Sequence, residues 1–105
     1  MKPLLVDEII HYLIHRWGKK YDFRLFKRGK YLYFQMMWGF LGQESFPLNE
    51  MEYKKSIADK IEILNRCGYS DEVRVWLQKV NSRPRLGRAV SLKLKTNEKM
   101  KEFLI

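Results

Sequence analysis

The chain opens with apolar residues spaced as on one side of a helix. Val6, Ile10 and Leu13 lead to Trp17 in steps of three or four, while the residues between them are mostly polar. Pro3 precedes the run at a position that favours the first turn of a helix, and Gly18 follows it at a position typical of a helix end. This spacing predicts an amphipathic helix from about Pro3 to Trp17.

Strict alternation follows and predicts a β-hairpin. Residues 21–27 form one strand, residues 30–38 form the next, and Arg28-Gly29 is expected to be the two-residue turn. Pairing Lys27 with Lys30 brings the apolar residues of both strands onto one face, which supports this register. The residues that we expect on this face are Tyr21, Phe23, Leu25, Leu32, Phe34 and Met36, and we expect all of them except Tyr21 to be buried whichever side the helices cover.

Two further helices and a third strand complete the predicted fold. Asn49 and Glu52 form a capping-box pattern at the start of a helix that Gly68 ends, and a second helix runs from Ser70 to about Val80. Alternation over 89–95 predicts a strand, and residues 96–105 are expected to be a short docked helix or a frayed extension. The order α-β-β-α-α-β predicts an α+β fold over residues 1–95: a single small domain whose three-stranded, mainly antiparallel sheet packs against helices.

Composition fits one small globular domain: 105 residues, of which 46% are hydrophobic and 31% are charged. Its single cysteine, Cys67, excludes an intrachain disulfide and favours a reducing compartment. No apolar run reaches the roughly 20 residues that span a bilayer. Asp7 and Glu8 lie inside the first apolar segment, which is atypical of a signal peptide, so we expect a cytoplasmic protein.

The net charge of +9 is unevenly distributed. Residues 1–43 hold eight Lys/Arg and three acids, residues 83–105 hold seven and two, and the segment between them holds six and seven. Such an excess of positive charge attracts nucleic acids, anionic membranes or acidic proteins, and it also keeps a small protein in solution. The oligomeric state does not follow from these features.

The residue types that carry catalysis are sparse. His11 and His15 have a spacing that can hold a metal, but the chain has only three His and Cys residues in total, so two solvated histidines are the better interpretation. Cys67 lies at a predicted helix end, where the helix dipole disfavours a thiolate. No glycine-rich phosphate loop is present. We therefore expect no catalytic residues, no metal, no cofactor and no enzymatic activity.

The outward face of the predicted hairpin combines rings and cations. Its candidate nucleic-acid-binding residues are Arg24, Phe26, Arg28, Tyr31, Tyr33 and, from the third strand, Lys93. Aromatic rings on an open sheet stack on unpaired bases while cations hold phosphates. The alternative is that two helices cover one face and the third helix covers the other, which would make the tyrosines edge residues of the core.

Three sequence blocks together resemble a small family of unknown function found in cyanobacteria and plastid-bearing eukaryotes. The blocks are Arg16-Trp-Gly-x-x-Tyr-Asp22, Gln35-Met-Met-Trp38 continuing to Ser45-Phe-Pro-Leu-x-Glu-x-Glu-Tyr53, and Arg83-Pro-Arg-Leu-Gly-Arg-Ala-Val-Ser91. The resemblance covers about residues 5–94 and leaves residues 96–105 beyond the usual family end. It implies an oxygenic phototroph, with the bacterial cytosol favoured over the plastid stroma, and it carries over no catalytic residues.

The third block contains the candidate anion- or partner-binding residues Arg83, Arg85 and Arg88. Three guanidinium groups around a rigid proline suit carboxylate or phosphate, which leaves a small-anion or catalytic site as a further option. Alternatively, one arginine pairs with Asp22 or Glu52 and fixes the loop. The leading hypothesis is a non-enzymatic interaction module, of the kind that assists assembly or regulation in phototrophs, that binds an acidic protein through this loop and the sheet face. The second hypothesis is binding of RNA or single-stranded nucleic acid.

Overall fold

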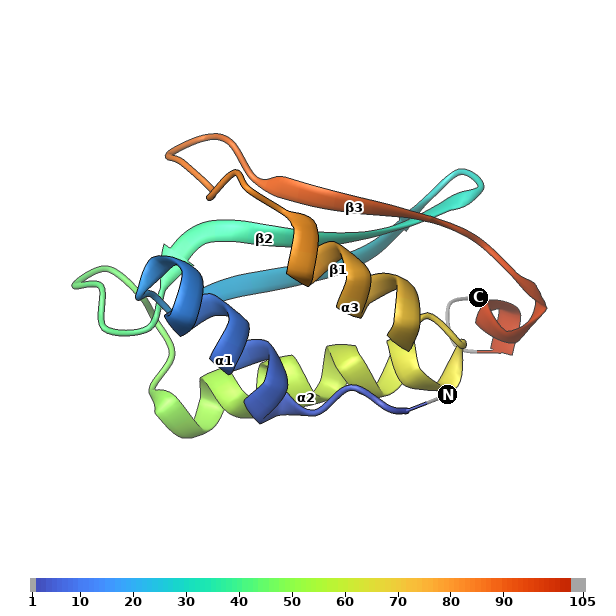
Figure 1. The fold of residues 1–105 in the computed structure, drawn as a ribbon, viewed down its shortest axis with the longest axis horizontal. Coiled ribbons are helices and arrows are strands. Elements are labelled where there is room, and N and C mark those ends of the chain that lie inside the picture. Colours follow the sequence, from blue (N-terminus) through green and yellow to red (C-terminus); the bar gives the residue numbers. More distant parts are fainter. Residues whose placement is uncertain (1, 103–105) are drawn as a thin grey trace.

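The computed structural model describes residues 2–102 and confirms the predicted order of elements. Figure 1 shows a small sheet lying over a layer of helices. The elements are α1 (Val6–Trp17), β1 (Tyr21–Arg28), β2 (Tyr31–Phe40), α2 (Glu50–Arg66), α3 (Ser70–Lys79), β3 (Val90–Lys95) and the 3-10 helix η1 (Glu98–Glu102).

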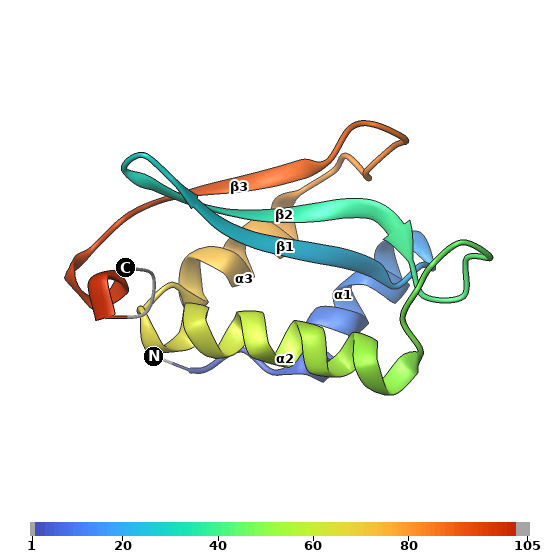
Figure 2. The same cartoon turned by 180° about the vertical axis from the view of Figure 1, so that it is seen from behind.

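The sheet has the strand order β1-β2-β3 with both neighbouring pairs antiparallel. Helices α1, α2 and α3 all lie on the same side of it, as the two opposite views show (Figures 1 and 2). Phe23, Phe34 and Leu94 point into this layer and are buried against the helices. The other face of the sheet is covered by no helix within residues 2–102, so the alternative arrangement with helices on both faces is wrong.

Between Phe23 and the turn, the β1–β2 register differs from the predicted one by two residues, and an irregularity before Phe23 pairs Tyr21 with Phe40. Arg28 pairs with Tyr31 and Leu25 with Phe34, so the turn consists of Gly29 and Lys30 instead of Arg28 and Gly29. Gly29 has φ +61°, and glycine at the first of two turn residues is the placement favoured in a type II′ turn. Because the shift is an even number of residues, every side chain keeps its predicted face.

Burial on the helix-facing side follows the sequence prediction with one exception. Phe23, Leu32, Phe34 and Met36 are buried, but Leu25 is only half-buried. Leu25 lies toward the turn end of β1, two residues before the exposed Lys27 on the same face. In the edge strand β1 the core therefore ends at Phe23, whereas Leu32, which pairs with Lys27 from the central strand β2, stays fully buried.

Helix α1 begins at Val6, later than the predicted start near Pro3. The residues before it are held extended because Leu4 forms two backbone hydrogen bonds with the Asn65 side chain, donating to Oδ1 (2.8 Å) and accepting from Nδ2 (3.0 Å). The end of α1 is as predicted: Gly18 adopts φ 72° and donates to the carbonyl of Ile14.

The predicted capping box starts α2. The amide of Glu52 donates to Asn49 Oδ1 (2.8 Å), and the amide of Asn49 donates to Glu52 Oε1 (3.0 Å). Beyond β3, η1 places Met100 in the core, where its sulfur lies 3.1 Å from the Tyr69 hydroxyl that donates to the Lys95 carbonyl. Residues 96–102 thus contain the short docked helix, and residues 103–105 lie outside the described part of the chain.

Candidate functional site

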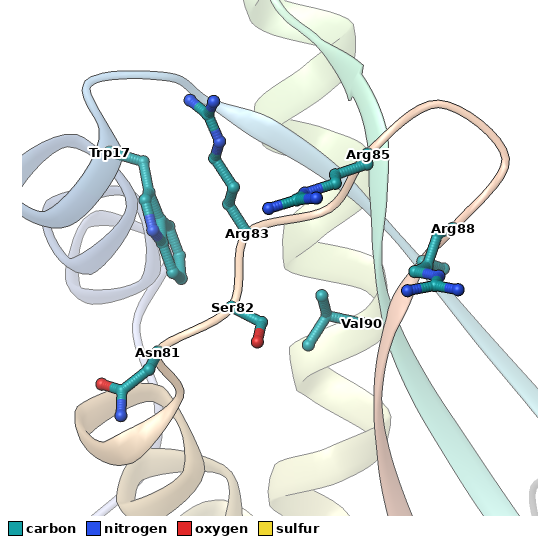
Figure 3. Close-up of a pocket in the computed structure, with 8 residues that line it drawn as sticks. Trp17, Asn81, Ser82, Arg83, Arg85, Arg88 and Val90 are labelled. Atoms are coloured by element: carbon teal, nitrogen blue, oxygen red, sulfur yellow. The ribbon is translucent and has the colours of Figure 1, made fainter.

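The three arginines of the 83–88 loop lie around one pocket of about 640 Å³. We call it the arginine pocket, and it is lined by Trp17, Asn81, Ser82, Arg83, Arg85, Arg88, Ala89 and Val90. Trp17 from the end of α1 forms one wall, the extended segment after α3 forms another, and Val90 at the start of β3 lies opposite (Figure 3). The structure therefore brings together residues from both ends of the chain.

The end of α3 is held in place by Arg16. Its guanidinium donates to the carbonyls of Gln78 (2.6 Å) and Val80, the last turn and C-cap of the helix. These carbonyls have no partner inside the helix, so an arginine here satisfies them and complements the negative helix end. Because Trp17 follows Arg16 directly, the same contact fixes the indole wall beside the loop.

Arg85 and Arg88 flank a tight turn in the same loop. Their backbones exchange two hydrogen bonds, from the Arg85 amide to the Arg88 carbonyl (2.9 Å) and from the Arg88 amide to the Arg85 carbonyl (2.8 Å). Gly87 completes the turn with φ 74°, a conformation that side-chain-bearing residues rarely adopt. The loop thus holds two arginines on a small ordered hairpin that carries the exposed Leu86 at its tip.

The arginine pocket is rich in hydrogen-bond donors and contains no acidic side chain among its lining residues. Within residues 2–102, the side chains of Arg83, Arg85 and Arg88 form no ion pair and no hydrogen bond. The alternative in which one of them pairs with Asp22 or Glu52 is therefore wrong. Glu52 belongs to the capping box, and the buried Oδ1 of Asp22 has no hydrogen-bond partner within residues 2–102.

The second candidate surface is the uncovered side of the sheet, which we call the open face. Arg24, Phe26 and Arg28 reach it from β1, Tyr31 and Tyr33 from β2, and Lys93 from β3. Phe26 and Tyr33 are paired across the strands and stack with ring centroids 5.3 Å apart. Tyr31 is 37% exposed, whereas Phe26 and Tyr33 are half-buried. The structure thus brings the six predicted residues onto one exposed surface.

Cations of the open face already lie against its rings. Lys93 Nζ is 3.9 Å from the centroid of the Tyr31 ring. The guanidinium carbons of Arg24 and Arg28 lie 5.0 and 5.5 Å from the Phe26 centroid. Such contacts are attractive, and they cover ring surface that stacking on a base would need. A nucleic acid would have to displace them.

The arginine pocket and the open face belong to opposite sides of the sheet. Val90, which lines the pocket, pairs with the buried Met36 and so faces the helices. Ser91 is the next residue and faces the other way, where Gln35 donates to its hydroxyl (2.9 Å). Strand β3 forms the edge of the sheet between the two surfaces, so they are two separate candidate sites.

The remaining candidates for chemistry do not assemble into a site. His11 and His15 stack on the exposed side of α1 with ring centroids 5.7 Å apart. Within residues 2–102, no group of three or more His, Cys, Asp or Glu side chains is arranged to hold a metal. Cys67 is buried at the end of α2. No helix in the same part of the chain combines the length and apolar character that crossing a bilayer requires.

The shifted pKa values occur in the core and at one structural ion pair. Arg74 donates to both carboxylate oxygens of Glu8 (2.5 and 3.0 Å), and this hydrogen bonding lowers the pKa of Glu8 and raises that of Arg74. Burial, with a contribution from the nearby Asp22 carboxylate, raises the pKa of Tyr53, whose hydroxyl donates to the Tyr21 carbonyl (2.7 Å). Both sets of groups hold elements together and lie outside the two candidate surfaces.

Sequence reasoning found the arginines but missed the other walls of the pocket. The helical spacing places Trp17 in the apolar stripe of α1, and Asn81 and Ser82 simply follow the predicted end of α3 near Val80. One signal was available, because Arg16-Trp17 and Arg83–Ala89 belong to two of the sequence blocks that carry the family resemblance. Nothing in the spacing of residues showed that the two blocks meet in space.

Comparison with known proteins agrees with the fold. The solution NMR structure of the Alr2454 protein from Nostoc sp. strain PCC 7120 matches with a TM-score of 0.83 and 32% sequence identity, covering 97% of this chain and 98% of that one. Among curated proteins, no sequence matches.

The sequence profile of a domain of unknown function, DUF3067, matches residues 7–104. The matched range includes most of residues 96–105, which the sequence resemblance had placed beyond the usual family end. The family match and the cyanobacterial structure agree with the kind of family that the three sequence blocks indicated. This chain belongs to the DUF3067 family.

Proposed function

We propose that this protein is a non-enzymatic interaction module that binds an acidic protein partner through the arginine pocket. The observation that carries this proposal is the set of three guanidinium groups around one pocket, without an acidic partner within residues 2–102. The arginines that join elements of this fold have partners there: Arg74 pairs with Glu8, and Arg16 donates to carbonyls at the end of α3. Unpaired arginines on an ordered loop offer planar donor pairs that match carboxylates.

The setting that we propose is the cytoplasm of an oxygenic phototroph, where the module assists assembly or regulation. The similarity to a Nostoc protein supports this setting. The net charge of +9 adds a long-range attraction that speeds the approach of an acidic protein. The arginine pocket would then supply the specific contacts, because charge alone does not select a partner.

A defined acidic polypeptide tests the proposal. We expect labelled polyglutamate to bind the wild-type protein and to bind the double variant Arg85→Gln/Arg88→Gln about tenfold more weakly, the effect of losing roughly 1.4 kcal/mol. The matched control is Lys27→Gln/Lys30→Gln, which removes the same charge from exposed side chains at the far end of the sheet. If the two variants lose affinity equally, the binding reflects net charge and the proposal fails.

The second candidate function is binding of RNA or single-stranded nucleic acid on the open face. It is favoured by the absence of any helix on this face within residues 2–102 and by the exposed Tyr31 ring. We rank it second because cations already lie against the Tyr31 and Phe26 rings. Titration with labelled RNA over a salt series distinguishes the two candidate functions. Binding that falls steeply with salt and is weakened by Tyr33→Ala supports nucleic-acid binding. No binding at low salt rejects it.

A further inference from the structure

The arginine pocket contains more than charge. Trp17, Ala89 and Val90 are half-buried and give it apolar lining beside the guanidinium groups. A volume of about 640 Å³ is in the range of pockets that enclose a ligand side chain or a small molecule. A ligand that contacted only the arginines would leave this apolar surface exposed to water. The lining therefore fits a ligand with both an apolar and an anionic part.

The arginines are also separated from one another. Figure 3 shows the Arg83 guanidinium directed toward the loop after α1, that of Arg85 directed across the pocket, and that of Arg88 in the loop just before β3. A single phosphate is best held by donors that converge on one point. Donors that point in different directions suit several separate anionic groups, such as carboxylates along a peptide.

The segment between α3 and the hairpin offers backbone donors as well. Within residues 2–102, the amides of Asn81, Ser82 and Arg83 donate no hydrogen bond, to backbone or side chain. The chain leaves α3 in an extended conformation, with Val80 at φ -65° and ψ 126°. Unpaired amides on an extended segment can bind the backbone carbonyls of a second extended segment. This feature again favours a peptide over a small anion.

We infer that the arginine pocket binds a short acidic peptide segment in which an apolar side chain lies between carboxylates. The apolar side chain contacts Trp17 and Val90, and the flanking carboxylates reach Arg85 and Arg88 on one side and Arg83 on the other. The inference rests on the proposed function, since it specifies which part of an acidic partner the pocket recognises. It adds a requirement that charge alone does not impose, namely the apolar residue between the acids.

Two labelled synthetic peptides of equal charge test this requirement. One contains Glu-Glu-Leu-Glu-Glu, and the other has Ser in place of Leu. We expect the Ser peptide to bind about tenfold more weakly, because its side chain buries no apolar surface against the indole. We expect the Leu peptide to shift the Trp17 indole N–H resonance, assigned with Trp17→Phe, while the indole of Trp76 on α3 stays unchanged. Arg85→Lys/Arg88→Lys should weaken binding several-fold because lysine keeps the charge but lacks the planar pair of donors.

The outcomes separate the inference from the proposed function. Equal affinity of the two peptides, both sensitive to Arg85→Gln/Arg88→Gln, overturns the apolar contact and leaves the binding of an acidic partner intact. Failure of both peptides to bind, or insensitivity of both to the arginine substitutions, overturns the proposed function as well. An RNA oligonucleotide that displaces the Leu peptide and moves the same Trp17 resonance would show that the pocket takes nucleic acid instead.

Discussion

Some arginines of this chain hold the fold together, whereas others form no ion pair or hydrogen bond through their side chains within residues 2–102. Arg16 donates to the carbonyls at the end of α3, and Arg74 donates to Glu8 and to the carbonyls of Lys2 and Pro3. Both join the N-terminal segment to α3. Arg85 and Arg88 make no such contact through their side chains within residues 2–102. The same residue type therefore serves stability at one place and is free for binding at another.

Removing the Arg74 side chain should destabilise the fold measurably. Its pair with Glu8 is largely shielded from solvent, with side chains 19% and 24% exposed, so we expect Arg74→Ala to lower the free energy of unfolding by about 2 kcal/mol at neutral pH. The pair Arg66–Glu62, with both side chains 60% exposed, supplies the control: Glu62→Gln should change stability by less than about 0.5 kcal/mol. Urea denaturation measures the stability of both variants. Equal losses would contradict a larger contribution of the Arg74–Glu8 pair to stability.

The same pair predicts a pH dependence of stability. The hydrogen bond with Arg74 lowers the pKa of Glu8 in the folded protein below its ordinary value of 4.5. The contribution of Glu8 is therefore complete above that value and is lost as the pH falls through the lowered pKa. We expect Glu8→Gln to be less stable than the wild type at neutral pH and to lose less stability on acidification. The free energy of unfolding of both proteins is measured from pH 6 down to about two pH units below 4.5. If Glu8→Gln loses as much stability as the wild type, Glu8 is not the source of the pH dependence.

At the scale of elements, features coded by neighbouring residues were predictable and features set by distant contacts were not. The capping box of α2 was confirmed because Asn49 and Glu52 lie within one turn. The faces of β1 and β2 followed from alternation alone. The start of α1 was missed because Leu4 is held extended by Asn65, a residue on another helix. The register of the hairpin was wrong because the predicted turn has Gly29 as its second residue. In the structure, Gly29 is the first residue of the turn and adopts a positive φ.

The hairpin turn provides a direct test at this scale. Gly29 has φ +61°, and a Cβ added there would meet no atom within 4 Å, so the cost of Gly29→Ala comes from the backbone conformation alone. We expect a loss of about 1 kcal/mol in the free energy of unfolding. Lys30→Ala in the same turn is the control and should have little effect, because Lys30 has no positive φ. Thermal unfolding measures the Tm of both variants. Equal decreases in Tm would contradict this turn geometry.

At the scale of the whole molecule, the fold places on opposite sides of the sheet two positively charged surfaces that the leading sequence hypothesis combined into one binding site. Arginines before β3 line the arginine pocket on the helix side of the sheet, and Lys93 within β3 belongs to the open face. The uneven distribution of charge along the chain was visible in the sequence. How this charge is shared between the arginine pocket and the open face depends on which side of β3 each residue faces. The pocket also depends on α1, which brings Trp17 to the loop.

This separation predicts that the two surfaces act independently. We expect Arg85→Gln/Arg88→Gln to weaken binding of the acidic Leu peptide about tenfold and to change RNA binding only slightly. Where RNA binding is measurable, we expect Arg24→Gln/Lys93→Gln to weaken it and to change binding of the Leu peptide only slightly. Both double variants lose two positive charges. Anisotropy titrations of both ligands against both variants at physiological salt measure the four affinities. If each variant weakens both ligands by the same factor, the ligands respond to the overall field of a protein with net charge +9 and neither surface is a specific site.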